Sequence, residues 1–147
     1  MLEVLKVLHT LLAIAAVGTN ISFPVWTRLA EREGSALAFT LSGVRFVDRW
    51  VTIPSYLFCA LTGIALVVGA RIPFSLPWIW ISLVLFAFLM VLGFGPYRPL
   101  SRERLALART HAIDDDYRRV DRKIDLLDGG IIGAAVVITV LMVARPG

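Results

Sequence analysis

The chain has little of what most catalytic and metal sites are built from. Its 147 residues include one cysteine, Cys59, and two histidines, His9 and His111. A single thiol cannot close a disulfide within the chain, and no cysteine–histidine spacing typical of a metal site occurs. We therefore expect no metal centre and assign no catalytic residue. Cys59 lies in an apolar run and is interpreted as a small buried hydrophobic residue.

Charge is also scarce. Charged residues make up 18% of the chain against 58% apolar residues, and the mean hydropathy is +0.78. A water-soluble domain of this length cannot bury so much apolar surface, so we expect the lipid bilayer to cover it. The N-terminus lacks a basic leader and an Ala-x-Ala cleavage site, which favours a retained span over a signal peptide. We expect a single domain over residues 1–147 and no nucleic-acid partner.

Four apolar segments have the length that a membrane-spanning helix needs, about twenty residues. These segments are Val4–Trp26, Val51–Ala70, Leu76–Phe94 and Leu126–Ala144. The sequence thus predicts an all-α membrane protein, a four-transmembrane-helix bundle. A charged cytoplasmic helical connection joins spans three and four in this prediction.

Arginine and lysine residues are distributed unevenly between the two sides of these spans. The first and third connections share one side and together carry twelve of them, whereas the other side carries only Lys6, Arg71 and Arg145. Basic loops remain in the cytoplasm. We therefore predict a multi-pass protein of the bacterial inner (cytoplasmic) membrane with both termini outside.

The connection from Ser101 to Lys123 is predicted to be helical, and Asp115 and Arg119 form an i, i+4 pair that supports it. Two interpretations remain open. Its arginine-rich surface either binds anionic lipid or a membrane protein partner, including a second copy of the chain, or is simply a solvated helix. His111 falls in this connection and is interpreted as an exposed polar residue.

His9 is the one histidine expected within the membrane, where an ionisable group costs free energy and usually has a partner or a task. It lies six or seven residues from the outer end of its span, roughly 10 Å at helical rise. Thr62, Ser82 and Thr139 lie at similar depths in the other three spans. These four residues are therefore candidates to line one pocket.

The first span carries a second feature, which adds to this candidate pocket. His9, Ala13, Ala16 and Asn20 follow spacings of four, three and four, which place them on one side of a helix. Small residues there allow a neighbouring helix or a flat ligand to approach closely. Asn20 is costly to expose to lipid, so this face is predicted to look into the bundle.

Two further residues bear on helix geometry. Pro54 is expected to kink the second helix, with Ser55 bonding the freed carbonyl. Asp128 is interpreted as the cap of a helix that begins at Gly129 and Gly130, where the helix dipole favours a carboxylate.

Three roles for His9 remain open on these grounds. It could be an axial haem ligand, with its second ring nitrogen held by a hydrogen-bond acceptor. It could carry protons. It could also bond to Ser82 or Thr62 and fix the helix register. Met90 and Met142 are predicted to lie too far from the level of His9 to act as a second ligand.

The whole chain resembles a family of small bacterial membrane proteins known as domain of unknown function 2269. The residues that carry the resemblance are Leu8-His9, Pro54, Leu61-Thr62-Gly63 and the ending from Val140 to Pro146. The resemblance implies four spans and no particular activity.

The chain also resembles, more distantly, the four-helix membrane protoporphyrinogen oxidases that carry a b-type haem. Leu8-His9, Arg28-Leu29, Pro54 and Thr62-Gly63 match that family's pattern. The resemblance implies that His9 is a ligand of haem b. The family's third helix carries a lysine after a tryptophan, whereas this chain reads Trp78-Ile79-Trp80-Ile81-Ser82 and has no lysine or arginine in that span.

Two functions follow from these observations. The first is a small integral membrane protein with a polar intramembrane pocket around His9, which binds haem or acts in redox chemistry. The second is a non-enzymatic accessory or scaffold protein that uses its arginine-rich cytoplasmic helix to bind a partner or anionic lipid.

Overall fold

A computed structural model describes residues 1–110 and 113–144 of the chain, and all regular structure in these ranges is helical. The prediction of an all-α fold is therefore confirmed. Six α-helices and two π-helical turns follow one another as α1 (Leu2–Glu33), α2 (Leu37–Val47), η1 (Asp48–Thr52), α3 (Ile53–Gly69), α4 (Pro77–Leu92), η2 (Gly93–Tyr97), α5 (Arg98–Ala108) and α6 (Asp115–Ala144).

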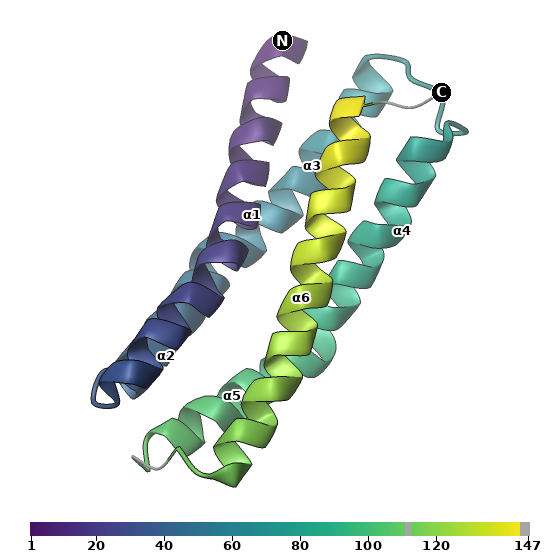
Figure 1. Ribbon diagram of the computed structural model, residues 1–147. Coiled ribbons are helices and arrows are strands. Elements are labelled where there is room, and N and C mark those ends of the chain that lie inside the picture. The colour runs from purple at the N-terminus through teal and green to yellow at the C-terminus, as the bar shows by residue number, and fades with distance from the viewer. Residues whose placement is uncertain (111–112, 145–147) are drawn as a thin grey trace.

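These elements join into four long helical rods (Figure 1). Among the described residues, four helices are long and apolar enough to cross a membrane, namely Leu2–Glu33, Leu37–Gly69, Pro77–Ala108 and Asp115–Ala144. The second and third rods run through η1 and η2 without a break. With 30 to 33 residues, each rod is about 45–50 Å long, well beyond the roughly 30 Å of a hydrocarbon core.

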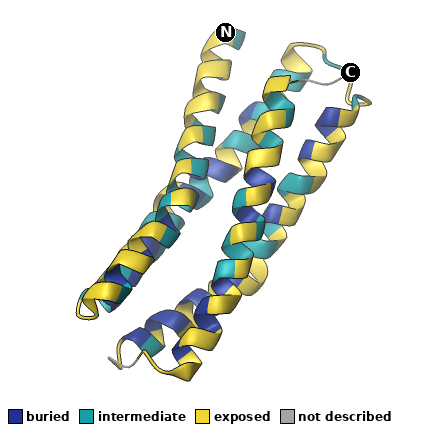
Figure 2. Cartoon of the chain, viewed as in Figure 1, coloured by how far each residue is buried: buried dark blue, intermediate teal, exposed yellow. Residues whose placement is uncertain are grey.

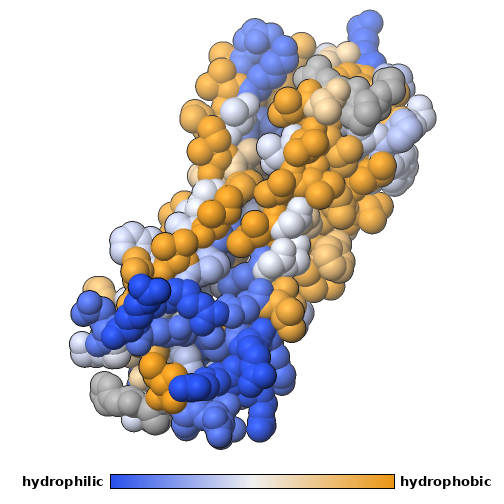
Figure 3. Space-filling model, viewed as in Figure 1, coloured by the Kyte–Doolittle hydropathy of each residue, from blue (hydrophilic) through white to orange (hydrophobic). Residues whose placement is uncertain are grey.

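The parts of the rods that exceed the thickness of the hydrocarbon core lie mainly at one end of the bundle. Figure 3 shows a hydrophilic surface there and a largely apolar surface over the rest of the visible face. We call this end, formed by the last turns of α1, by α2, by α5 and by the start of α6, the charged end. The N-terminus, the α3–α4 turn and the last residue of α6 lie at the opposite end (Figure 1).

The outer surface between these ends is apolar. Large hydrophobic side chains are exposed on every rod, including Ile14, Phe58, Val84, Phe88 and Val140. Figure 2 shows exposed residues along the outward sides of the helices. Exposing so continuous an apolar surface to water would cost too much free energy, so we expect lipid to cover it.

Hydropathy located the four spans but underestimated how far their helices continue. The first connection is mostly helix, because α1 runs to Glu33 and α2 begins at Leu37. Gly34 turns the chain between them with a φ of +59°, and its N–H donates to the carbonyl of Ala30 at 3.0 Å. This backbone conformation suits glycine, which lacks a Cβ.

The predicted helix from Ser101 to Lys123 is interrupted. α5 ends at Ala108 and α6 begins at Asp115, where the Asp114 carboxylate accepts a hydrogen bond from the Tyr117 N–H at 2.9 Å. The exposed ion pair in this region joins Arg119 to Asp116 at 3.9 Å rather than to Asp115. His111 lies outside the described residues, as do residues 145–147.

The interpretation of Asp128 as a helix cap is wrong. α6 is continuous from Asp115 to Ala144, so Asp128 lies near its middle. The polar first half of α6 stays helical because one of its faces is buried through Tyr117, Val120 and Ile124. Packing of that face outweighs the weak helix propensity of Gly129 and Gly130.

Two helix pairs dominate the packing. α1 lies mainly against α3, and α4 lies mainly against α6. The central core contains Ala16, Tyr56, Leu89, Ile124 and Ile131, and a second cluster at the charged end surrounds Leu41 and Tyr117. Pro54 lies just after η1 inside the continuous second rod, so its missing N–H leaves the preceding turn without one backbone donor.

The charged end is held by an ion-pair network as well as by apolar packing. Asp121 of α6 accepts hydrogen bonds from Arg104 of α5 at 2.8 Å and from Arg28 of α1 at 3.1 Å. Arg28 also pairs with Glu31 and Asp125. This network joins three rods at a point where Arg104 and Asp121 are almost fully buried.

Candidate functional site

His9 of α1 points toward α3, and its ring is held by that helix. Nδ1 lies 3.0 Å from the carbonyl oxygen of Cys59 and 3.0 Å from Oγ1 of Thr62. A carbonyl oxygen only accepts hydrogen bonds, so Nδ1 carries the ring proton in this contact. The Thr62 hydroxyl donates to its own helix, at 2.8 Å from the Phe58 carbonyl. It therefore serves the ring as an acceptor too.

This arrangement leaves the second ring nitrogen with a free lone pair. A neutral imidazole that donates from Nδ1 is an acceptor at Nε2. No hydrogen-bond partner for Nε2 occurs among residues 1–110 and 113–144. The contacts of Nδ1 thus fix the orientation and the tautomer of the His9 ring, and Nε2 is available to a ligand.

His9 lines a cavity of about 240 Å³ between α1, α3, α4 and α6, which we call the His9 cavity. Most of its lining is apolar. The residues that line it are His9, Thr10, Ala13, Cys59, Ala60, Gly63, Ile64, Val67, Phe74, Trp78, Ile79, Ser82, Leu83, Phe86, Ile138, Thr139, Met142 and Val143. An apolar cavity with a few polar groups is the usual form of a small-molecule site.

Ser82 supplies an unused hydrogen-bonding group to this cavity. The residue is 2% exposed, and its hydroxyl has no hydrogen-bond partner among the described residues. Thr139 differs, because its hydroxyl donates to the Ala135 carbonyl of its own helix at 2.9 Å. Buried polar groups are normally paired, so an unpaired one beside a cavity indicates a role toward a ligand.

Gly63 lets the His9 ring lie close to α3. A Cβ at this position would sit 3.1 Å from Cε1 and 3.6 Å from Nδ1 of His9. A Cβ at this distance would require the ring to shift by a few tenths of an ångström, and a bulkier side chain would require a larger shift. Thr62 and Gly63 therefore both position His9. Thr62 accepts a hydrogen bond from the ring, and Gly63 leaves the space that the ring occupies.

Asn20 does not join the other predicted pocket residues. The structure places His9, Ser82 and Thr139 around one cavity, with Thr62 bonded to His9. Asn20 lies farther along α1, where its amide donates to the Tyr56 hydroxyl at 2.6 Å. It lines a separate cavity of about 40 Å³ that also includes Asp128. Between these two positions, Ala16 on the same face of α1 is fully buried.

Sequence reasoning missed two members of the site. The backbone carbonyl of Cys59 carries no side-chain signal and could not be found from residue type. Met142 was predicted to lie too near the surface to share the level of His9, yet it lines the same cavity. The signal was available, since Met142 follows Thr139 by three residues and shares its helix face.

Arg28, which matches the oxidase pattern, lies at the charged end and away from the His9 cavity. Its guanidinium belongs to the ion-pair network with Asp121 and Asp125. Among the described residues, no group of three or more histidine, cysteine, aspartate or glutamate side chains is placed to hold a metal ion.

Four apolar rods with a charged end define this protein as a multi-pass integral membrane protein. Within that class, the chain belongs to the family described as "Predicted integral membrane protein (DUF2269)", whose model matches residues 3–146. No curated protein and no solved structure matches the chain. The family defines the membrane location in general terms and leaves the activity to be inferred from the site.

The unpaired hydroxyl of Ser82 leads to a stability prediction. Ser82→Ala should raise the free energy of unfolding of the ligand-free protein by about 1 kcal/mol, because a buried donor without a partner is removed. Thermal unfolding in detergent measures this effect. Thr139→Val, which removes a satisfied hydroxyl, is the matched control and should give no gain. A lower melting temperature for Ser82→Ala would contradict the assignment of that hydroxyl as unpaired.

Proposed function

We propose that this membrane protein binds a planar, largely apolar prosthetic group in the His9 cavity, with haem b as the group and His9 Nε2 as the atom that would hold its iron. One observation carries the proposal. The Cys59 carbonyl fixes the proton on Nδ1 and leaves the Nε2 lone pair beside an apolar cavity. A histidine ligand whose other nitrogen donates to a carbonyl is the usual arrangement at metal and haem centres.

The residues around His9 fit such a group. Ala13 and Ala60 are small and leave room beside the ring, and Met142, which lines the same cavity, has a thioether that could also hold the iron. Ile64, Phe74 and Val143 line the cavity and are also exposed. The cavity therefore opens onto the lipid-facing surface, and a group larger than its volume can extend through that side.

The chain's own residues would have defined tasks toward this group. His9 would bind it, the Cys59 carbonyl would increase the basicity of the imidazole, and Ser82 would donate a hydrogen bond into the cavity. The apolar walls exclude water, which influences the redox potential. Bound haem supplies one-electron transfer. Oxidation of protoporphyrinogen is not included, because α4 carries no lysine or arginine.

A haem titration tests the proposal. Haem b added to the purified protein in detergent should produce a Soret band that saturates at one haem per chain. His111→Ala, which removes the other histidine of the sequence, is the matched control and should titrate like the wild type. An absorbance that rises without saturation, as for haem dissolved in micelles, would contradict the proposal.

We also propose that the charged end faces the cytoplasm of a bacterium and that both termini lie outside, following the basic-residue rule. A reporter that is active only outside the cytoplasm should be active when fused after Gly147. The same reporter inserted next to Gly34, in the turn between α1 and α2, should be inactive. The reverse pattern would overturn the orientation.

A second candidate function is that of a scaffold for a protein partner or for anionic lipid. Arg118, Arg119, Arg122 and Lys123 are all exposed on α6, opposite the buried Tyr117 and Val120. Neutralising these four residues should weaken binding to anionic vesicles, and added salt should weaken the binding of the wild type. Binding that is insensitive to both changes would exclude this role.

A further inference from the structure

Two π-helical turns occur in the second and third rods, between the apolar spans and the charged end. η1 (Asp48–Thr52) interrupts the second rod and η2 (Gly93–Tyr97) interrupts the third. π-helical turns are rare and occur frequently at functional sites, because they change the direction of the side chains that follow. Here both turns contribute residues to one cavity of about 160 Å³, which we call the arginine cavity.

The arginine cavity is built from two similar sequence segments. Arg45-Phe46-Val47-Asp48-Arg49 crosses from α2 into η1, and Arg98-Pro99-Leu100-Ser101-Arg102 lies in α5. Each segment places two arginines four residues apart, which sets both on one helix face. The cavity is lined by Arg45, Asp48, Arg49, Ile53, Tyr97, Arg98, Ser101 and Arg102.

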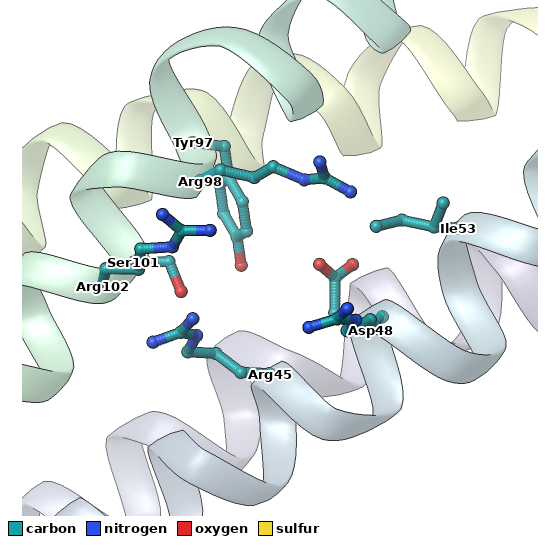
Figure 4. A pocket seen from close by; sticks show the side chains of 8 residues that line it. Arg45, Asp48, Ile53, Tyr97, Arg98, Ser101 and Arg102 are labelled. Atoms are coloured by element: carbon teal, nitrogen blue, oxygen red, sulfur yellow. The ribbon is translucent and has the colours of Figure 1, made fainter.

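Four arginines line this cavity beside a single carboxylate, that of Asp48, although the Arg49 guanidinium lies 6.0 Å from the exposed Trp50 ring. Figure 4 shows the side chains of Arg45, Arg98 and Arg102 extending into a common space opposite Asp48. None of the four arginines forms an ion pair with a carboxylate in the part of the chain that the structure describes. Arg98 instead lies over the Phe94 ring at 4.3 Å. Such a cluster repels itself unless an anion offsets its charge.

Two buried hydroxyls complete the site. Tyr97 is 7% exposed and Ser101 is 8% exposed. Neither hydroxyl has a hydrogen-bond partner among residues 1–110 and 113–144. Both oxygens point into the space between the arginines (Figure 4). Neither oxygen is among the fully buried side-chain atoms that lack a partner, so both are open to the cavity. Each hydroxyl can therefore donate a hydrogen bond to a ligand held between the arginines.

We propose that the arginine cavity binds a phosphate group, with the guanidinium groups and the Tyr97 and Ser101 hydroxyls as donors. Guanidinium groups bind phosphate through paired hydrogen bonds, which distinguishes phosphate from a simple point charge. The phosphate belongs either to a lipid headgroup or to a soluble phosphate. Exposed Trp50 and Phe94 flank the cavity, as aromatic residues do at membrane interfaces. This site is separate from the His9 cavity and stands independently of haem binding.

Binding to the purified protein in detergent tests the site with two probes. Isothermal titration with inorganic phosphate detects a soluble ligand, and native mass spectrometry with short-chain phosphatidic acid detects a lipid headgroup. One phosphate or one lipid per chain supports the site, and the probe that binds identifies the source. Phosphatidylcholine, whose phosphate is shielded by a cation, should bind more weakly than phosphatidic acid. Failure of both probes to bind would overturn the proposal.

Charge variants locate the binding within the chain. Arg45→Gln with Arg102→Gln should weaken binding by at least about tenfold, since a hydrogen bond to a charged group contributes that much. Arg32→Gln with Arg71→Gln removes the same charge from exposed positions outside the arginine cavity and should leave it unchanged. An equal loss of affinity in the two double variants would show that the probe is attracted only by the overall positive charge of the surface, and it would overturn the proposed site.

A gain in affinity excludes misfolding as the cause of these effects. Asp48→Asn removes the one carboxylate that opposes the anion and should strengthen phosphate binding several-fold. Asp116→Asn, at an exposed carboxylate on α6, is the matched control and should have no effect. Unchanged or weaker binding by Asp48→Asn would contradict the proposed position of the phosphate.

Discussion

Replacing Asp121 with asparagine should lower the free energy of unfolding by about 3–5 kcal/mol, the usual cost of breaking a buried ion pair. The side chains of Asp121 and Arg104 are 9% and 5% exposed, and their charged atoms lie 2.8 Å apart. Asparagine keeps the size of the side chain but leaves the Arg104 charge uncompensated. Nε of Arg104 already has no partner among the described residues. In the variant, no other carboxylate in the described part of the chain replaces Asp121 as the partner of this guanidinium.

Reversible unfolding in mixed micelles measures this loss. Asp116→Asn is the control, because its ion pair with Arg119 is exposed and spans 3.9 Å, and it should change the free energy by less than about 1 kcal/mol. Combining Asp121→Leu with Arg104→Met should recover much of the loss, since an apolar pair has no charge to compensate. Similar stabilities for Asp121→Asn and Asp116→Asn would show that the network does not hold the charged end together.

Replacing His9 with alanine should abolish haem binding altogether, the largest functional effect expected for any single substitution. His9 is the one histidine in the His9 cavity, and its Nε2 is the proposed ligand atom. Added imidazole should restore part of the Soret band by occupying the space that the ring leaves. This rescue would show that His9→Ala keeps its fold and lacks only the ligand.

Gly63→Val tests the same contact from the opposite helix. Its side chain would collide with the His9 ring, since even a Cβ lies 3.1 Å from Cε1. We expect weakened haem binding with His9 still present. Gly18→Val is a control in the first span, because a Cβ there meets no atom within 4 Å. Equal haem affinity in the wild type and Gly63→Val would show that the ring position set by α3 is unimportant.

The sequence identified the four rods because hydropathy marks the lengths of helix that face lipid. It could not show where the helices end, because the turns at the charged end are held by tertiary contacts. The polar start of α6 is helical because Tyr117, Val120 and Ile124 bury one of its faces. Asp128 was misassigned for the same reason, since a cap was expected where the helix in fact continues.

Counting residues from the span ends placed Ser82 and Thr139 at the depth of His9, and both line the same cavity. Asn20 was assigned to the pocket from its helix face and not from this count, and a shared helix face does not imply a shared depth. The arginine cavity was overlooked because its arginines were considered only as orientation signals. Their matching four-residue spacing was visible in the sequence, but the proximity of the two segments depends on the packing of α2 against α5.

The central claim is that His9 holds a prosthetic group inside the membrane bundle. The most direct measurement is the visible absorption spectrum of the full-length protein purified from cells supplied with haem, recorded beside His9→Ala at equal protein concentration. We predict a Soret band of about one haem per chain in the wild type and none in the variant. Colourless wild-type protein, or equal bands in the two proteins, would contradict the account.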